Sequence, residues 1–250
     1  MFIELILAGS FVGVLSGFFG IGGGMILVPI LMLIGFDIKQ AIAISVVQMF
    51  FSSLFGSYLN YKKGNLKLNE GIFVGIGGML GALIGATLTE LLPQEYLAYA
   101  LLALVLYALY KVAFSKKPEG AEEKSLSPIV LFIVGFFIGI ISIMLGVGGS
   151  ILLTPILVGF LHYSTKKAAS ASLFFVVFSS ISGVVYKFYN HIFDNLHLDL
   201  KAVFAVAIAS LIGVVLGIKL KEIIKDTHHK AALIALYLVI VAILVDKIFF

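Results

Sequence analysis

One short glycine-rich stretch, present twice, constrains the fold of this chain more than any other feature. The first copy, from Gly20 to Leu31, reads GIGGGMILVPIL, and the second, from Gly146 to Leu157, reads GVGGSILLTPIL. Glycine-rich backbone exposes N–H groups and lets a ligand approach closely. A helix that begins directly after the glycines points unpaired N–H groups and the positive end of its dipole at the same place. Each copy therefore predicts a helix break that is suited to binding a ligand.

The apolar character of the chain indicates that these breaks lie in a membrane. Hydrophobic residues make up 61% of the 250 residues and charged residues 12%, whereas soluble domains are about 45–50% apolar and about 25% charged. Cysteine is absent, which excludes disulfides and cysteine-based metal or catalytic sites. The net charge of +4 comes from lysines without any arginine. Because these lysines lie in loops, we interpret them as topology signals and expect no nucleic-acid partner.

Ten apolar segments predict an all-α, polytopic membrane protein embedded in a lipid bilayer. The first segment lacks a basic n-region and a small-residue cleavage site, so we interpret it as a retained helix and not a signal peptide. The only long charged stretch, which also contains proline and glycine, lies near mid-chain at residues 115–127. The segments before and after it are Phe2–Phe19, Met25–Phe36, Ile38–Tyr61, Gly71–Leu91, Tyr96–Phe114, Pro128–Leu145, Ile151–Leu161, Lys167–Tyr189, Leu200–Leu220 and Ala231–Phe249.

The order of the segments predicts an internal duplication. Ser16 aligns with Ser142 at the same offset that aligns the two glycine stretches, and one residue further on in register Ser45 aligns with Ser172. Gly81–Gly85 aligns with Gly213–Gly217 in the same order. A repeated order of motifs is the signature of duplicated architecture. We therefore divide the chain into a first membrane repeat (1–114), a linker (115–127) and a second membrane repeat (128–250).

The lengths of the segments predict that the two repeats are inverted relative to each other. The second segment of each repeat has about a dozen residues, which suits a half-helix rather than a full span. It would pair with the first segment in a re-entrant hairpin, and three full spans would follow, an odd number. In this topology both termini lie outside and the linker is cytoplasmic. Most lysines then fall inside, as the positive-inside rule requires, with four outside: Lys39, Lys187, Lys201 and Lys247. A parallel eight-span topology fits the lysines less well.

The hairpin tips are the candidate substrate-binding site. In an inverted pair the hairpins enter from opposite faces, so their glycines can meet near the midplane, where backbone N–H groups suit an anion. The alternative is that the glycines only permit close helix packing, the interpretation that we prefer for Gly77, Gly78, Gly81, Gly85, Gly213 and Gly217. The predicted binding residues at the tips are Gly22, Gly23, Gly24, Met25, Gly148, Gly149, Ser150 and Ile151, with Gly20, Pro29, Gly146 and Pro155 as helix-break or hinge positions.

Polar residues within the apolar segments are the second set of candidates. Ser45 and Gln48 lie on one helical face of the third segment, and Ser172 occupies the position of Ser45 in the second repeat. A glutamine in mid-membrane must face the protein interior. Gln48 either lines the substrate pathway or only forms a hydrogen bond to a neighbouring helix, and both alternatives stay open.

The residues that are absent also restrict the function. No carboxylate lies deep within an apolar segment, so the sequence does not support proton or sodium coupling through a buried acid. Efflux of an anion from a cell with a negative interior needs no coupling ion, since it gains about 2.3 kcal/mol per charge per 100 mV. No metalloprotease, nucleophile-elbow or P-loop motif is present. We expect no enzyme activity, no metal and no cofactor, and the sequence does not indicate an oligomeric state.

The doubled GxGG[GS]xxxxPxL motif, with an AxAxS or AxSxS motif downstream in each repeat, resembles the sulfite exporter TauE/SafE family of membrane permeases. The resemblance covers nearly the whole chain. It implies a prokaryotic inner-membrane protein that moves small anions, chiefly sulfite and organosulfur compounds. Ser150 replaces the glycine found at Gly24 in the first copy, so the two tips are not expected to be equivalent. We therefore predict a transporter that exports sulfite or a related organosulfur anion. The rival interpretations are an anion channel and a membrane assembly factor.

Overall fold

The computed structural model describes residues 2–19, 22–62, 64, 66, 68–114, 127–163, 165–223 and 226–249. Throughout these residues the chain is helical and forms no strand, so the all-α prediction is confirmed. The helices are α1 (Phe2–Phe19), α2 (Gly24–Ile34), α3 (Ile38–Lys62), α4 (Leu68–Leu91), α5 (Gln94–Phe114), α6 (Pro128–Met144), α7 (Ser150–Leu161), α8 (Thr165–Tyr189), α9 (Ile192–Asn195), α10 (Leu200–Ile223) and α11 (Asp226–Phe249).

Ten of these helices coincide with the ten predicted segments to within a few residues. The exception is α9, a single turn between α8 and α10 that the apolar pattern did not predict. Its N-cap residue, His191, adopts a left-handed backbone with φ of 51°. A turn of this length has too few residues to show a hydrophobic period, so the pattern has nothing to detect.

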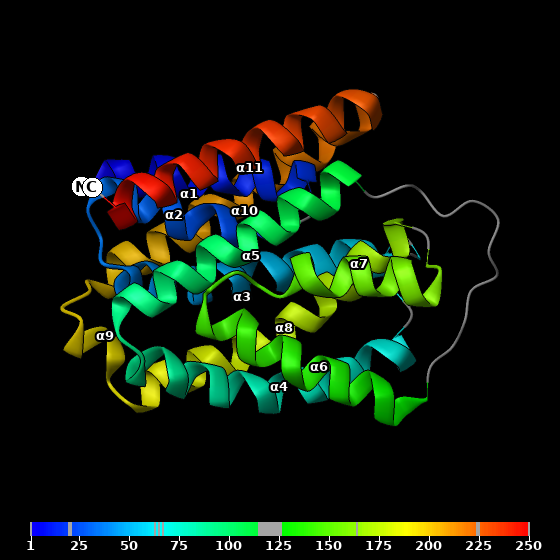
Figure 1. The fold of residues 1–250 in the computed structure, drawn as a ribbon, viewed down its shortest axis with the longest axis horizontal. Coiled ribbons are helices and arrows are strands. Elements are labelled where there is room, and N and C mark those ends of the chain that lie inside the picture. Colours follow the sequence, from blue (N-terminus) through cyan, green and yellow to red (C-terminus); the bar gives the residue numbers. More distant parts are fainter. Residues whose placement is uncertain are drawn as a thin grey trace.

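The ribbon shows α1 and α2 as a hairpin and α6 and α7 as a second hairpin (Figure 1). In Figure 1, α1 runs from the left end, where both termini lie, towards the right, and α2 returns to the left. Conversely, α6 runs from right to left and α7 returns to the right. With 11 and 12 residues, α2 and α7 are about 16–18 Å long at about 1.5 Å per residue. Neither helix could cross a bilayer core of about 30 Å.

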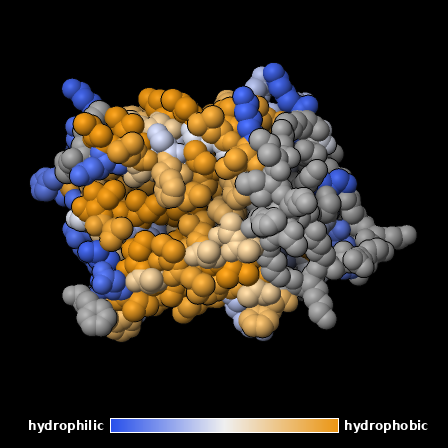
Figure 2. Space-filling view, turned by 90° about the horizontal axis from the view of Figure 1, so that it is seen from above, coloured by the Kyte–Doolittle hydropathy of each residue, from blue (hydrophilic) through white to orange (hydrophobic). Residues whose placement is uncertain are grey.

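The surface and the helix lengths suit a bilayer. Six of the described helices are long and apolar enough to cross a membrane, namely α3, α4, α5, α8, α10 and α11. Figure 2 shows hydrophobic side chains over the middle of the molecule and hydrophilic ones at its left end. Large apolar side chains such as Ile212, Phe137 and Val239 are more than half exposed, which indicates a lipid-facing surface. The protein is a multi-pass membrane protein.

Glycines join the two halves at two helix crossings. In α1, a side chain at Gly9, Gly13 or Gly17 would collide with the α10 backbone at Val206, Ser210 or Val214 respectively. In α4, Gly77, Gly81 and Gly85 approach the α6 backbone in the same way. Both series advance along the two helices together, so α1 is parallel to α10 and α4 is parallel to α6. Each half thus packs its first helix on the helix that forms the fourth apolar segment of the other half, and small residues allow the backbones to touch.

Replacing Gly81 by alanine tests this packing. The added Cβ would lie 2.9 Å from the Phe136 carbonyl carbon and 3.1 Å from the Ile140 amide nitrogen, and a backbone cannot move aside as a side chain can. We expect a loss of about 1–3 kcal/mol, typical of overpacking, measured as a lower thermal midpoint in detergent. The control is Gly159→Ala, because Gly159 is helical and has no heavy atom within 4 Å of the added Cβ. Equal midpoints for the two variants would contradict the close crossing.

Candidate binding site at the hairpin tips

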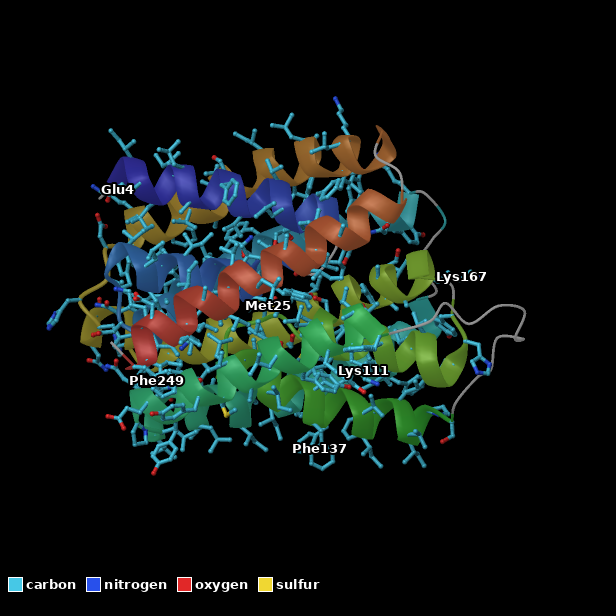
Figure 3. The ribbon with its side chains drawn as sticks, turned by 45° about the horizontal axis from the view of Figure 1, so that its top comes forward. Glu4, Met25, Lys111, Phe137, Lys167 and Phe249 are labelled. Carbon is cyan, nitrogen blue, oxygen red and sulfur yellow. The ribbon has the colours of Figure 1, made fainter. Side chains whose placement is uncertain are left out.

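The two hairpin tips meet inside the molecule. We define the first tip as residues 22–25 and the second tip as residues 146–151. A Cβ on Gly24 would collide with the carbonyl oxygen of Gly146, and a Cβ on Gly22 would lie 3.0 Å from Ser150 Oγ. Figure 3 shows Met25, the second residue of α2, near the middle of the molecule. The two segments that the sequence singled out are therefore in contact, although more than a hundred residues separate them.

Every described residue of both tips is buried. Met25 is fully buried, and Ser150 and Ile151 are 1% and 7% exposed. A solute in water on either side of the membrane therefore cannot reach the tips in this conformation. Of the predicted hinge residues, Gly146 and Pro29 are also buried, Pro155 is half-buried, and Gly20 lies outside the described residues.

The left-handed backbone conformation of the second tip explains why glycine occupies three of its positions. Gly146, Gly148 and Gly149 have φ of 65°, 81° and 54°, values in the left-handed region that residues with a Cβ rarely adopt. In the first tip Gly22 has φ of 71°, whereas Gly23 is right-handed with φ of −66°. The tips therefore reach the same position through different backbone paths. This agrees with the expectation, drawn from Ser150, that they are not equivalent.

The two prolines lie inside the half-helices, not in the first turn. Pro29 is the sixth residue of α2 and Pro155 the sixth residue of α7. A proline there donates no hydrogen bond to the carbonyl group four residues earlier. In this chain those carbonyls belong to Met25 and Ile151, which are both predicted site residues.

Helix α3 places its polar face between the tips. Ser45 Oγ donates a hydrogen bond of 2.7 Å to the carbonyl oxygen of Gly146, so a residue of the first half binds the second tip. Met49 Sδ lies 2.6 Å from a Cβ built on Gly24 and 2.7 Å from one built on Gly148. The thioether of Met49 therefore contacts both tips. Methionine side chains are flexible, so this one can change rotamer without moving the helix.

Gln48 lies against the first tip, and its amide has no protein partner. A Cβ on Gly23 would come within 2.6 Å of Gln48 Oε1 and 2.8 Å of its Cδ. Gln48 is fully buried, and neither Oε1 nor Nε2 has a hydrogen-bonding group within reach. The sequence left open whether Gln48 lines the pathway or forms a hydrogen bond to a neighbouring helix. The structure contains no such bond, and it places the amide at the tip.

In the second half, the position that corresponds to Gln48 is occupied by an aromatic residue. Phe175, three residues after Ser172, occupies the position of Gln48, three residues after Ser45. Its ring lies against Gly149 on one side and Gly78 of α4 on the other. Ser172 itself accepts a hydrogen bond of 2.9 Å from Thr154 Oγ1 of α7, the half-helix of its own half, whereas Ser45 binds the tip of the other half. The unpartnered amide of the site thus lies on α3, and an aromatic ring takes its position on α8.

Sequence reasoning missed three residues at this site: Met49, Phe175 and Ser142. The hydroxyl group of Ser142 is buried without a hydrogen-bonding group in reach, and its Cβ is 3.2 Å from a Cβ built on Gly149. The repeat alignment paired Ser142 with Ser16 but did not indicate that it lies at a tip. Methionine and phenylalanine are apolar, like most residues of these segments, so nothing in the sequence distinguishes Met49 and Phe175 from ordinary packing residues.

The sequence analysis also did not predict a buried ion pair between α8 and α4. Lys187, which we expected outside the membrane, is fully buried near the end of α8, and its Nζ lies 3.4 Å from Glu90 Oε1 of α4. Lys39 Nζ donates a hydrogen bond of 2.7 Å to the Glu90 carbonyl oxygen. Lys187 lies inside the predicted segment Lys167–Tyr189, and the sequence did not indicate that this lysine is buried and paired with a carboxylate of α4. Lys187 is the only charged side chain among the buried residues that the structure describes.

Comparisons with known proteins agree with a transport function. The family model described as "Sulfite exporter TauE/SafE" matches residues 5–244. A Bacillus subtilis protein named "Probable membrane transporter protein YdhB" is 23% identical over 235 residues, covering 92% of this chain and 94% of its own. A "Probable membrane transporter protein" of Methanocaldococcus jannaschii is 28% identical, with 92% and 90% covered. No solved structure matches the chain.

Proposed function

The chain belongs to the sulfite exporter TauE/SafE family and is a membrane transporter, and from this premise we propose that it exports a small anion through the hairpin tips. The substrate class that the family's description supports is sulfite or a related organosulfur anion. The observation that carries the proposal is the contact of the two tips, with the unpartnered amide of Gln48 against the first tip. Tips with helix N-termini and neutral donors suit an anion in transit, because no buried counter-charge traps it.

The same proposal includes the topology. Residues 1–114 and 128–250 form two inverted repeats, joined by a cytoplasmic linker at 115–127, with both termini outside a prokaryotic inner membrane. The opposite directions of α1 and α6 in Figure 1, and the common end at which both termini lie, support it. Outward movement of an anion from a negative interior gains about 2.3 kcal/mol per charge per 100 mV. Export in this direction therefore needs no coupling ion.

The moving units are not the two repeats themselves. Backbone contacts through glycine join α1 to α10 and α4 to α6, so separating the repeats would break both crossings. We assign the α1–α10 pair to one moving unit and the α4–α6 pair to the other, with α3 and α8 between them. Each unit then carries helices from both repeats, and small shear movements across α3 and α8 would open the tips to one side at a time.

The test is anion flux in proteoliposomes that contain the purified protein. We expect saturable flux of sulfite and accelerated exchange when unlabelled anion is present on the opposite side. Gly23→Val and Gly149→Val should reduce the flux at least tenfold, whereas Gly159→Val, at an exposed position without neighbours, should not. Non-saturable flux without exchange would favour a channel. Wild-type flux in both tip variants would disprove the site.

A further inference from the structure

The neutral surroundings of Gln48 restrict the ionic form of the substrate. We propose that the site between the tips takes its anion with a single charge and with a proton still attached, as in hydrogen sulfite. This inference rests on the proposed function and specifies it further. The inference is drawn from the two unpartnered polar atoms of one buried amide and from the absence of charge among the described side chains that face it.

The amide of Gln48 needs a ligand that both accepts and donates hydrogen bonds. Its Nε2 offers two donors and its Oε1 is an acceptor, and both atoms are buried without a protein partner. The hydroxyl group of Ser45, one turn away, already donates to Gly146. A fully deprotonated oxyanion could accept from Nε2 but would leave Oε1 unpaired, which costs about 1–3 kcal/mol. An anion that keeps one O–H group satisfies both atoms, in either orientation of the amide.

No charged side chain faces Gln48 from the helices around it. The helices packed against α3 are α1, α2, α5, α6, α8 and α10. Their described charged residues all lie within five residues of a helix end, and they are Glu4, Glu95, Lys111, Lys167, Lys187, Lys201 and Lys219. Phe175, in the middle of α8, precedes Lys187 by 12 residues, or about 18 Å along the helix axis at about 1.5 Å per residue.

The charge of the bound anion is therefore balanced only by dipoles. The free energy needed to move an ion out of water rises steeply with its charge. A dianion would meet this cost without a nearby cation, whereas a monoanion could be held by N–H groups, the amide and the Ser142 hydroxyl. Sulfite and its monoanion interconvert near neutral pH, so both forms are available to the protein. The neutral site favours the monoanion.

The experiment compares three anions over a range of pH, with equal pH on both sides of the proteoliposome membrane. Sulfite loses its proton within the range, methanesulfonate carries one charge and no proton, and sulfate is a dianion. At a fixed total concentration, we expect sulfite flux to fall about tenfold per pH unit above the acid's second pKa, following the protonated fraction. Methanesulfonate flux should not change with pH and should be weaker than that of hydrogen sulfite. Sulfate should not be transported.

The matched variant is Gln48→Leu, which removes the donor and the acceptor but keeps much of the volume. It should fold, because replacing unpaired buried polar atoms with apolar ones is neutral or stabilising, and an unchanged or higher thermal midpoint checks this. We expect its preference for hydrogen sulfite over methanesulfonate to disappear. An unchanged preference would show that the amide only holds water and would overturn the inference. So would sulfite flux that stays constant or rises with pH. Absence of flux for every anion would instead disprove the proposed function.

Discussion

Replacing Gly24 by alanine should abolish anion transport, because Gly24 is the point at which the two tips touch through backbone. The added methyl group would collide with the Gly146 carbonyl oxygen, and it would lie 2.8 Å from Ser45 Oγ, which donates to that same oxygen. To accommodate it the tips must separate or the Ser45 hydrogen bond must break. Overpacking of this kind costs about 1–3 kcal/mol. If the whole cost fell on the transport cycle, the upper end would correspond to more than a hundredfold loss of rate.

Comparing the initial flux rates of Gly24→Ala and Gly23→Ala distinguishes loss of the backbone contact between the tips from a non-specific loss of folded protein. The three heavy atoms nearest the Cβ of the Gly23→Ala variant all belong to the side chain of Gln48, which can rotate away, so a partial loss of flux is expected. The order of initial flux rates should be Gly159→Ala equal to wild type, then Gly23→Ala, then Gly24→Ala. Size-exclusion profiles must be unchanged for the comparison to count. Equal rates for Gly23→Ala and Gly24→Ala would argue against backbone contact between the tips.

The sequence predicted the helices well because hydrophobic runs bounded by glycine, proline or charge leave few alternatives in a bilayer. The short lengths of α2 and α7 followed from counting residues, and the doubled glycine motif pointed to the tips. What it could not supply was the partner of each polar side chain. Gln48 was equally compatible with lining the pathway and with bridging helices, because the choice depends on which atoms lie within about 3 Å. Only the packed structure shows that no hydrogen-bonding group lies within reach of Gln48 Nε2 or Oε1.

The swapped packing of the two halves was beyond the sequence for a similar reason. Gly9, Gly13 and Gly17, like Gly77, Gly81 and Gly85, have the small-xxx-small spacing that marks a helix interface. The spacing identifies the contacting face of a helix but not the helix that it contacts. Pairing α1 with α10 and α4 with α6 requires three-dimensional information. It also restricts the possible movements, since separating residues 1–114 from residues 128–250 as rigid bodies would break both crossings.

The buried pair of Lys187 and Glu90 gives the largest expected effect on stability. Removing the carboxylate by Glu90→Gln leaves a fully buried ammonium group with its closest counter-charge gone. Breaking a buried pair in this way costs about 3–5 kcal/mol. We expect a value near the lower end, since the Glu90 side chain is 24% exposed. At roughly 2–4 °C per kcal/mol for a chain of this size, the thermal midpoint in detergent should fall by several degrees at least.

The double variant Glu90→Gln with Lys187→Met tests whether the loss of thermal stability in Glu90→Gln arises from the unpaired ammonium group of Lys187. Methionine matches the apolar stem of lysine, and removing both charges of a buried pair is often neutral, so the midpoint should return close to that of the wild type. Lys187→Met alone should cost less than Glu90→Gln, because water can still reach the carboxylate. If the double variant were as unstable as Glu90→Gln, the side chains would stabilise the helix ends by packing and not by charge.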